Sequence, residues 1–422
     1  MHTSSDNIFS HNFKIYPFSL LQLLLFLFIL GATTLSYLEG LSKIVILYGV
    51  CFTFLYIIYI LYTKQVVILP EVIIYFAWVF WSIGGAVNAA NKEAYIVGLR
   101  TVIQISVMFF LISGLVSTRS NMFKIALIGL IIGGLIQSMF VFSTGELTTS
   151  IKTINARVQG LSKNANSFAF QMLTVIFAVF YFLEKKANYI IRFLLWLTLL
   201  VSFIGIIYSG SRNGFLCLLF FLFWWYLFCK QKKLPKHPIL VYIILIIIFL
   251  ILYLSFTSLL EHTLIWKRFS AFDDNSSQTR LFLYKEGFDM IAKKPIFGIG
   301  LNNFSESSKT GLYSHSDYIE VAANTGIIGF ILYFSIYVIL WFRLGRIKKN
   351  TVDAQLLQII GVLKASILTI LIFGIGKPHI NSKLTWIYLS AVAGYTWQLE
   401  QAVKTQLSNK PWILRAVKKY IS

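Results

Sequence analysis

The chain has 422 residues, of which 57% are hydrophobic and 13% are charged, and its mean hydropathy is +0.75. A water-soluble protein of this size could not bury so much apolar surface, so the composition excludes that class and predicts a polytopic membrane protein. The formal net charge of +21 does not indicate a nucleic-acid partner, because the cations lie mostly in segments between apolar runs.

We expect an all-α fold, with residues 1–422 forming one membrane domain of roughly twelve spans, each about twenty residues long. The first apolar run is too long for a signal peptide and no small-residue cleavage site follows it, so we expect no cleavable leader. The expected spans are 18–38, 44–63, 71–90, 97–117, 123–143, 166–184, 189–208, 213–229, 239–257, 318–342, 356–376 and 383–399.

The distribution of Lys and Arg predicts the orientation of these spans. If the N-terminus is cytoplasmic, the inner segments carry clearly more cations than the short outer ones, as the positive-inside rule requires. Both termini are then cytoplasmic, and residues 400–422 form a basic tail on the anionic inner leaflet.

A segment over residues 258–317 joins the ninth and tenth expected spans and is far longer than a simple connection needs. Its apolar residues recur at helical spacing: Leu281, Tyr284, Phe288 and Ile291. They predict an amphipathic helix that starts near Arg280, presents an apolar face to the bilayer and stops at Pro295. We interpret this extracytoplasmic loop, which closes on His315, as a catalytic lid.

Four short stretches carry the candidate chemistry. In ARVQGLSKNANSFAF, over 156–170, Arg157 and Lys163 precede Asn164 and Asn166 at the start of the sixth span. The asparagines can cap that helix and the cations can complete an anion site, although a plain interfacial cap has the same pattern. In YSGSRNGFL, over 208–216, Arg212 opens the eighth span.

A guanidinium at membrane depth costs about 2.5–3.5 kcal/mol on insertion scales, so Arg212 should be paired, bind a ligand or snorkel to headgroups. Arg280 in SSQTRLFLY could equally anchor a lid helix to lipid phosphates. The fourth stretch, YSHSDYIEVAANTGIIGF, holds polar residues at the mouth of the tenth span: His315, Asp317, Tyr318 and Glu320. A lone histidine there is either structural or catalytic.

Two outward arginines and one histidine suit a reaction with a diphosphate leaving group. Guanidinium groups bind phosphate oxygens bidentately, and an imidazole accepts a proton from a sugar hydroxyl near neutral pH. Asp317 could orient the His315 ring or be the base itself. The three cysteines show no metal spacing, so we expect no metal and no cofactor.

The four stretches, in this order and within this layout, resemble the O-antigen ligase and polymerase superfamily of bacterial envelope glycosyltransferases. The resemblance implies a GT-C-like, metal-independent, inverting enzyme of the inner membrane whose donor is an undecaprenyl-diphosphate-linked glycan. By position, Arg212 and Arg280 match the arginines that bind the diphosphate and His315 matches the base. Where many members have His-Asn, this chain has His315-Ser316.

The acceptor is either a second lipid-linked repeat unit, as in a polymerase, or a lipid A-core sugar, as in a ligase. The HSDYIE form favours the polymerase. For the substrate contacts we expect these residues: Arg157, Lys163, Asn166, Asp317, Tyr318 and Glu320. Alternatives are a flippase for the same lipid-linked glycan, disfavoured because acidic residues are rare inside the spans, and a peptidoglycan-type glycosyltransferase.

Overall fold

The computed structural model describes residues 20–408 apart from 39, 120, 153–155 and 230–274. Every regular element in these residues is a helix, as predicted. Ten of the described helices are long and apolar enough to cross a membrane. The ninth expected span, 239–257, and the part of the loop over 258–274 lie outside the described residues.

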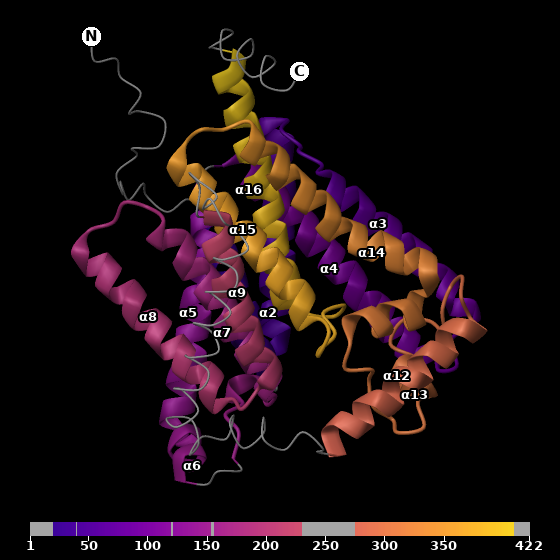
Figure 1. Ribbon diagram of the computed structural model, residues 1–422. Coiled ribbons are helices and arrows are strands. Elements are labelled where there is room, and N and C mark those ends of the chain that lie inside the picture. Colours follow the sequence, from indigo (N-terminus) through magenta and orange to yellow (C-terminus); the bar gives the residue numbers. More distant parts are fainter. Residues whose placement is uncertain (1–19, 39, 120, 153–155, 230–274, 409–422) are drawn as a thin grey trace, which may run out of the picture.

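Most expected spans correspond to observed helices, shown in Figure 1. The first group comprises α1 (Leu20–Thr33), α2 (Ser42–Thr63), α3 (Pro70–Ile83), α4 (Lys92–Thr118), α5 (Met122–Ser143), α7 (Ala165–Leu183), α8 (Tyr189–Tyr208) and α9 (Arg212–Cys229). The second comprises α14 (Asp317–Lys349), α15 (Ala354–Phe373) and α16 (Lys383–Ser408). The connections hold the short helices η1 (Leu35–Tyr37), η2 (Gly84–Val87), α6 (Glu146–Lys152), η3 (Gly160–Ser162) and α13 (Phe304–Ser307) and the longer helix α12 (Asn275–Lys293).

Helix α16 differs from the prediction in two ways. It continues to Ser408, so residues 400–408 extend the last helix and are not a separate tail, while 409–422 lie outside the described residues. It is also absent from the ten strongly apolar helices. Because α16 packs against α4, α5 and α14 and most of its side chains are buried in protein, it does not need the hydropathy that contact with lipid demands.

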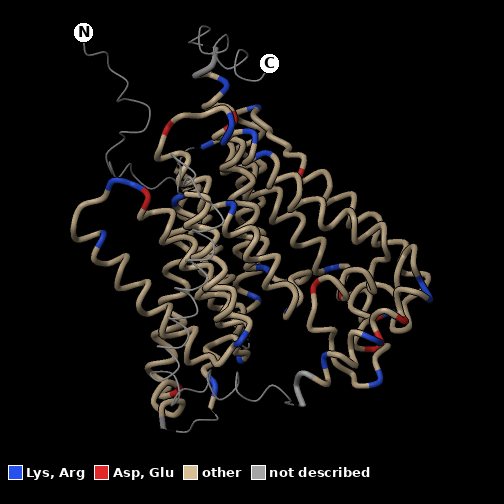
Figure 2. Tube along the Cα trace, in the orientation of Figure 1, with Lys and Arg blue, Asp and Glu red and all other residues tan. Residues whose placement is uncertain are grey.

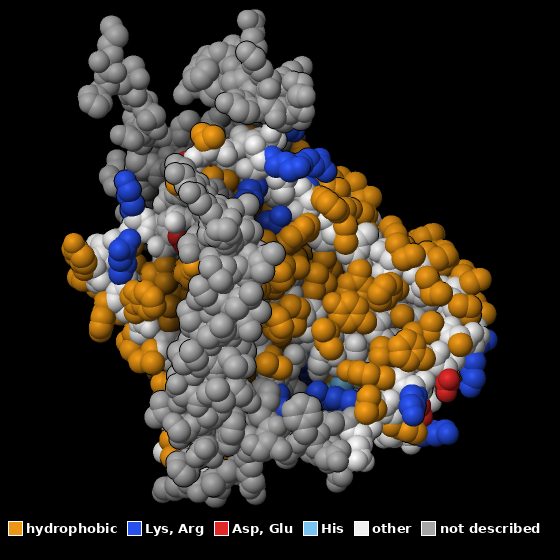
Figure 3. All heavy atoms as spheres, in the orientation of Figure 1, with side chains coloured by type: hydrophobic (Ala, Val, Ile, Leu, Met, Phe, Trp, Pro, Cys, Tyr) orange, Lys and Arg blue, Asp and Glu red, His pale blue; other side chains and the backbone are white. Residues whose placement is uncertain are grey.

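The charged side chains gather at the two ends of the bundle and are sparse between them (Figure 2). A broad apolar surface covers the middle (Figure 3), with exposed side chains such as Phe80, Phe193 and Trp196. In water such a band would be an aggregation site, whereas lipid tails cover it at no cost. The chain is therefore a multi-pass membrane protein.

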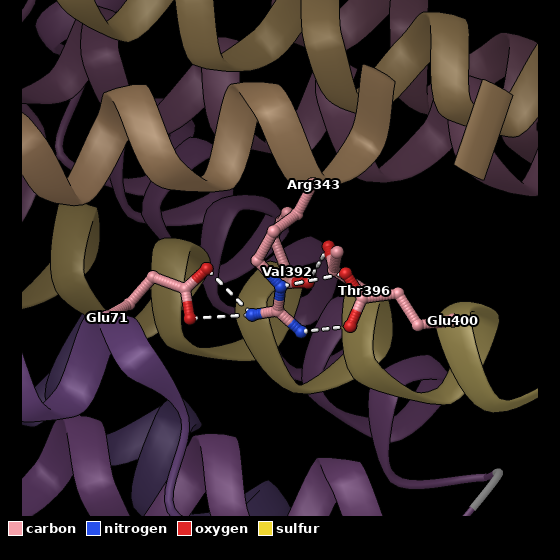
Figure 4. A network of polar contacts seen from close by, with 5 residues as sticks. All are labelled: Glu71, Arg343, Val392, Thr396 and Glu400. Carbon is pink, nitrogen blue, oxygen red and sulfur yellow. Dashed lines mark hydrogen bonds and ion pairs between the residues drawn. The ribbon is translucent and has the colours of Figure 1, made fainter. Parts of the chain in front are cut away.

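At one end of the bundle a buried ion network joins α3, α14 and α16 (Figure 4). The Arg343 guanidinium donates to both carboxylate oxygens of Glu71, at 2.7 and 2.6 Å, and to both oxygens of Glu400, at 3.0 and 2.8 Å. The Arg343 side chain is only 5% exposed and that of Glu71 is fully buried. Every oxygen of the two carboxylates has a donor, so the network is internally satisfied.

At the opposite end, α12 is fixed on α14 by packing and by backbone hydrogen bonds. Gly287 lets α12 approach Ile319 closely, above a small core of Leu283, Met290 and Phe304. Helix α14 is broken at Gly326, whose φ of 72° suits glycine. The 295–300 turn takes up the backbone groups at this break. The Ile299 and Gly300 amides donate to the carbonyls of residues 323 and 324, and the amide of residue 327 donates to the carbonyl of residue 295.

The predicted amphipathic helix is therefore present, and it ends at Lys293, before Pro295. Two residues of the predicted stripe, Leu281 and Phe288, are 62% and 63% exposed. The face packed on protein is offset from that stripe and is formed by Leu283, Gly287 and Met290. Leu281 and Phe288 are left free to contact lipid, whereas Tyr284 and Ile291 of the predicted stripe pack at the edge of the protein-facing side.

Candidate active site

The first stretch, 156–170, folds back onto the turn between α8 and α9. The amide of Val158 donates to the Tyr208 carbonyl, and the Arg157 Nε donates to the Ser209 carbonyl at 2.9 Å. Arg157 also reaches the Asn166 side-chain oxygen at 3.3 Å, which accepts from the Ser211 hydroxyl at 2.8 Å. Arg157 and Asn166 therefore lie beside the residue that precedes Arg212.

Asn164 caps α7, as the sequence indicates. Its side-chain oxygen accepts from the amides of Asn166 and Ser167, both at 3.0 Å. Lys163 lies one residue before this cap, exposed and with a φ of 50°. Arg212 is the first residue of α9 and is half-buried.

The third and fourth stretches meet around His315. The Arg280 charge lies close enough to act on both Tyr313 and His315, and the rings of these two residues are 4.2 Å apart. The Asn164 side chain also lies close enough to Tyr313 to act on the pKa of that phenol. Residues about 150 positions apart in the sequence are thus brought near each other, with Asn164 beside Tyr313 and Tyr313 beside Arg280 and His315.

His315 is held in an unusual backbone conformation, with a φ of 59°. Burial, with Arg280 as a second cause, lowers the pKa of His315 to about 4. The imidazole is therefore neutral at physiological pH and can accept a proton. Its Nδ1 and the Nε of Arg280 are buried without a hydrogen-bond partner among the described residues.

Glu320 supports the turn that carries His315. One Glu320 oxygen accepts from the Ser314 amide at 2.8 Å, and the other from the Asn324 side chain at 3.3 Å. The Ser314 hydroxyl in turn donates to the Ser316 carbonyl at 2.8 Å and accepts from the Ser316 amide. These contacts fix both residues that flank His315.

Asp317 and Tyr318 point away from His315 into the bundle. One Asp317 oxygen accepts from the backbone amides of His379 and Ile380, at 2.6 and 3.0 Å, and the other from the Tyr333 hydroxyl at 3.0 Å. The Tyr318 hydroxyl donates to the Leu371 carbonyl at 2.9 Å. The sequence places Asp317 two residues from His315, but α14 begins at Asp317 and directs its carboxylate toward the 374–382 loop.

This 374–382 loop, GIGKPHINS between α15 and α16, is a part of the site that the sequence analysis missed. Tyr284 of α12 donates to its Ile375 carbonyl at 3.0 Å, and Asp317 holds its His379 and Ile380 amides. The Lys377 ammonium donates to the hydroxyl of Ser167 in the first turn of α7. The sequence signal for this part of the site is a segment between two apolar spans that contains two glycines, one lysine and one histidine.

The histidine of this loop is part of its core. His379 is 1% exposed, its Nδ1 lies 2.9 Å from the Thr385 hydroxyl, and its ring packs on Phe170 at 4.6 Å. Burial and then the nearby Lys377 charge lower the pKa of His379 to about 3, so this ring is also neutral. Its inaccessibility distinguishes it from His315, which is half-buried.

On the face shown in Figure 3, Lys, Arg and His side chains lie together just below the apolar band. A basic cluster at the edge of a lipid-covered surface can hold the phosphates of a lipid and leave its chain in the bilayer. The described residues show no group of three or more His, Cys, Asp or Glu side chains arranged to hold a metal ion.

A family model described as O-Antigen ligase matches residues 197–334. The matched range contains Arg212, Arg280 and His315, and it excludes Arg157 and Lys377. No curated protein matches the chain. The family match confirms the predicted resemblance to the O-antigen ligase and polymerase superfamily over residues 197–334.

Proposed function

We propose that the chain is a membrane glycosyltransferase that takes a glycan from an undecaprenyl-diphosphate carrier and joins it to an acceptor hydroxyl. The observation that carries this proposal is the pairing of a neutral, half-buried imidazole at His315 with the guanidinium of Arg280, at the edge of the apolar band. The family match over residues 197–334 supports the same class of reaction.

In this proposal the cations bind the diphosphate. Arg212 and Arg280 neutralise the charge that grows on the leaving group, because guanidinium pairs match phosphate oxygens. Arg157, fixed by Ser209 and Asn166, supports the same region from the first stretch. Lys163, exposed on the turn before α7, contributes a weaker long-range attraction.

His315 acts as the general base. The acceptor oxygen attacks the anomeric carbon as its proton passes to the imidazole, and the bond from that carbon to the phosphate oxygen breaks. The undecaprenyl diphosphate leaves with both bonding electrons, and the attack from the opposite face inverts the anomeric centre. A covalent glycosyl-enzyme adduct would contradict this one-step route.

We assign Asp317, Tyr318 and Glu320 to the support of the site. Their polar atoms are taken up by Tyr333, the 374–382 loop, the Leu371 carbonyl and the turn at Ser314. Such contacts fix the position of the first turn of α14, and with it the position of His315, relative to the 374–382 loop. Of the two candidate bases that the sequence left open, this arrangement favours His315.

The acceptor is the remaining choice. The HSDYIE form of the fourth stretch favours a polymerase that joins lipid-linked repeat units of an O-antigen or exopolysaccharide. The description of the matching family, O-Antigen ligase, favours the alternative of transfer to lipid A-core. The excess of cations in the inner segments supports a reaction on the extracytoplasmic side of the bacterial inner membrane, with both termini cytoplasmic.

Deletion of the protein, complemented with wild type or with His315→Ala, tests the function through the surface glycan and the lipid-linked intermediates. A polymerase defect leaves single repeat units on the acceptor, whereas a ligase defect leaves long chains on the carrier lipid. A flippase defect keeps the repeat unit on the cytoplasmic side. Normal surface glycan in both His315→Ala and Arg280→Ala strains would remove the proposed site.

A further inference from the structure

The Lys377 ammonium is a partly buried cation that the proposed mechanism has not yet used. It donates to the neutral Ser167 hydroxyl, and it forms no ion pair with any carboxylate in the described part of the chain. Burial lowers the pKa of Lys377 to about 8. An ammonium has three donors, so at least one remains for a ligand.

Two contacts place Lys377 beside the residues that flank Arg212 and Asn166. Gly376 packs against Asn213: a Cβ atom at this glycine would lie 2.8 Å from the Asn213 side-chain nitrogen. The same nitrogen donates to the Phe373 carbonyl at 2.8 Å. Lys377 directly follows Gly376, and Arg212 directly precedes Asn213. Each cation is therefore adjacent in sequence to one residue of this contacting pair.

The other contact is with α7. Ser167, which accepts from Lys377, follows Asn166, which joins Arg157 to the Ser211 hydroxyl. Both Ser167 and Asn166 belong to the first turn of α7, where the positive end of the helix dipole adds to the attraction for an anion.

We propose that Lys377 is a further substrate-binding residue, which contacts a phosphate oxygen of the donor's diphosphate. The geometry divides the site in two: Arg280 lies with Tyr313 and His315 at the phosphate next to the reacting sugar, while Lys377 lies with Arg157 and Arg212 on the carrier side. The inference rests on the proposed function, because only that function supplies a diphosphate.

The arrangement also explains why the 374–382 loop is so strongly anchored. Tyr284 of α12 and Asp317 of α14 hold its backbone, and Asn213 of α9 holds the Phe373 carbonyl directly before it. A cation on a loop that is pinned from three helices is preorganised, so it loses little conformational entropy when it binds a phosphate. This fixed position distinguishes Lys377 from Lys309, which is exposed on the loop after α13.

The test measures binding of undecaprenyl diphosphate to the purified full chain in nanodiscs, with undecaprenyl monophosphate as the comparison lipid. We expect Lys377→Gln to weaken binding of the diphosphate about tenfold or more, the effect of a lost charge-assisted hydrogen bond. Lys377→Arg should retain most of the affinity. The matched surface control, Lys309→Gln, should bind as wild type.

Ser167→Ala separates ligand binding from a structural role. It removes the hydrogen-bond partner and keeps the ammonium, so we expect a clearly smaller loss than in Lys377→Gln. Equal losses in the two variants, or wild-type binding by Lys377→Gln, would overturn the assignment.

Three further variants distinguish this outcome from failure of the proposed function. His315→Asn should bind undecaprenyl diphosphate normally, since its role is in proton transfer. If Arg212→Gln and Arg280→Gln also bind like wild type, the whole diphosphate site fails; if only Lys377→Gln does, the inference about Lys377 fails alone.

Discussion

The two ends of the bundle hold buried charges in opposite ways. At one end, the Arg343 guanidinium is matched by two carboxylates, and each of its three nitrogens has an acceptor. At the other end, the Arg280 Nε and the His315 Nδ1 are buried without an acceptor or donor among the described residues. A satisfied network stabilises the fold, whereas polar groups left unmatched by protein are the ones that a substrate can use.

The Glu71 network also bears on whether the protein is a transporter. Acidic residues are rare in the expected spans, which disfavours a flippase, yet Glu71 is fully buried. The Glu71 carboxylate is paired with Arg343, which also pairs with Glu400. We therefore interpret this network as a structural one that stabilises the packing of α3, α14 and α16.

The largest effect on activity should come from His315→Asn. Asparagine tolerates the positive φ of this position, so the backbone should be retained while the base is lost. We expect the transfer rate to fall by about 100-fold to 10,000-fold, the usual contribution of general base catalysis. The measurement is turnover of the lipid-linked glycan pool that accumulates in a deletion strain, with the melting temperature as control.

The largest effect on stability should come from the other end. Arg343→Met leaves the buried Glu71 carboxylate and the partly buried Glu400 carboxylate without a partner. Loss of one member of a buried ion pair costs about 3–5 kcal/mol. We expect a much lower melting temperature in detergent, with near-normal activity in the fraction that stays folded. The triple variant Glu71→Gln, Arg343→Met and Glu400→Gln should recover part of the loss.

An unchanged melting temperature in Arg343→Met would show that the network does not stabilise the helix bundle. Loss of activity in protein that remains fully folded would instead point to a functional role for these charges.

The pH dependence of the reaction should show whether Arg280 acts on the pKa of His315. Because the pKa of His315 is lowered to about 4, the neutral, base-competent ring persists down to that pH, and activity should fall only below it. Arg280→Gln removes the second cause of the shift and leaves the larger one, burial. The acidic limb should therefore move up in pH, part of the way toward the ordinary histidine value of about 6.5.

Rates measured from pH 3 to 8 in both proteins check this prediction, because a shift of the limb does not depend on how much the maximal rate falls. An acidic limb that stays in place in Arg280→Gln would separate Arg280 from His315.

The smallest effect should be that of Tyr313→Phe. It removes the hydroxyl that lies near Asn164 but keeps the ring that lies beside His315. Loss of one polar group typically costs about 0.5–1.5 kcal/mol, so we expect a loss of a few-fold in turnover. A loss as large as that of His315→Asn would show that the tyrosine takes part in the chemistry.

The sequence predicted the helical architecture well, because twenty-residue apolar runs have few other solutions in a bilayer. It also predicted the Asn164 cap and the end of α12 before Pro295, which are local features. The full length of α16 was missed, because residues 400–408 are mostly polar and carry no hydropathy signal.

Within the site, the sequence could select residue types but could not give the directions of their side chains. Asp317 was grouped with His315 by proximity in the chain, yet its carboxylate holds the amides of His379 and Ile380. No local pattern singles out Lys377, because its contact with Ser167 spans 210 residues. Long-range pairings of this kind carry no local pattern.

The central claim is that the cations around His315 hold a diphosphate, and a cryo-EM structure of the protein with bound undecaprenyl diphosphate tests it most directly. We predict phosphate density in contact with Arg212 and Arg280, next to the His315 ring and at the edge of the apolar band. Density at another site, or phosphates held by the opposite end of the bundle near Arg343, would contradict the account.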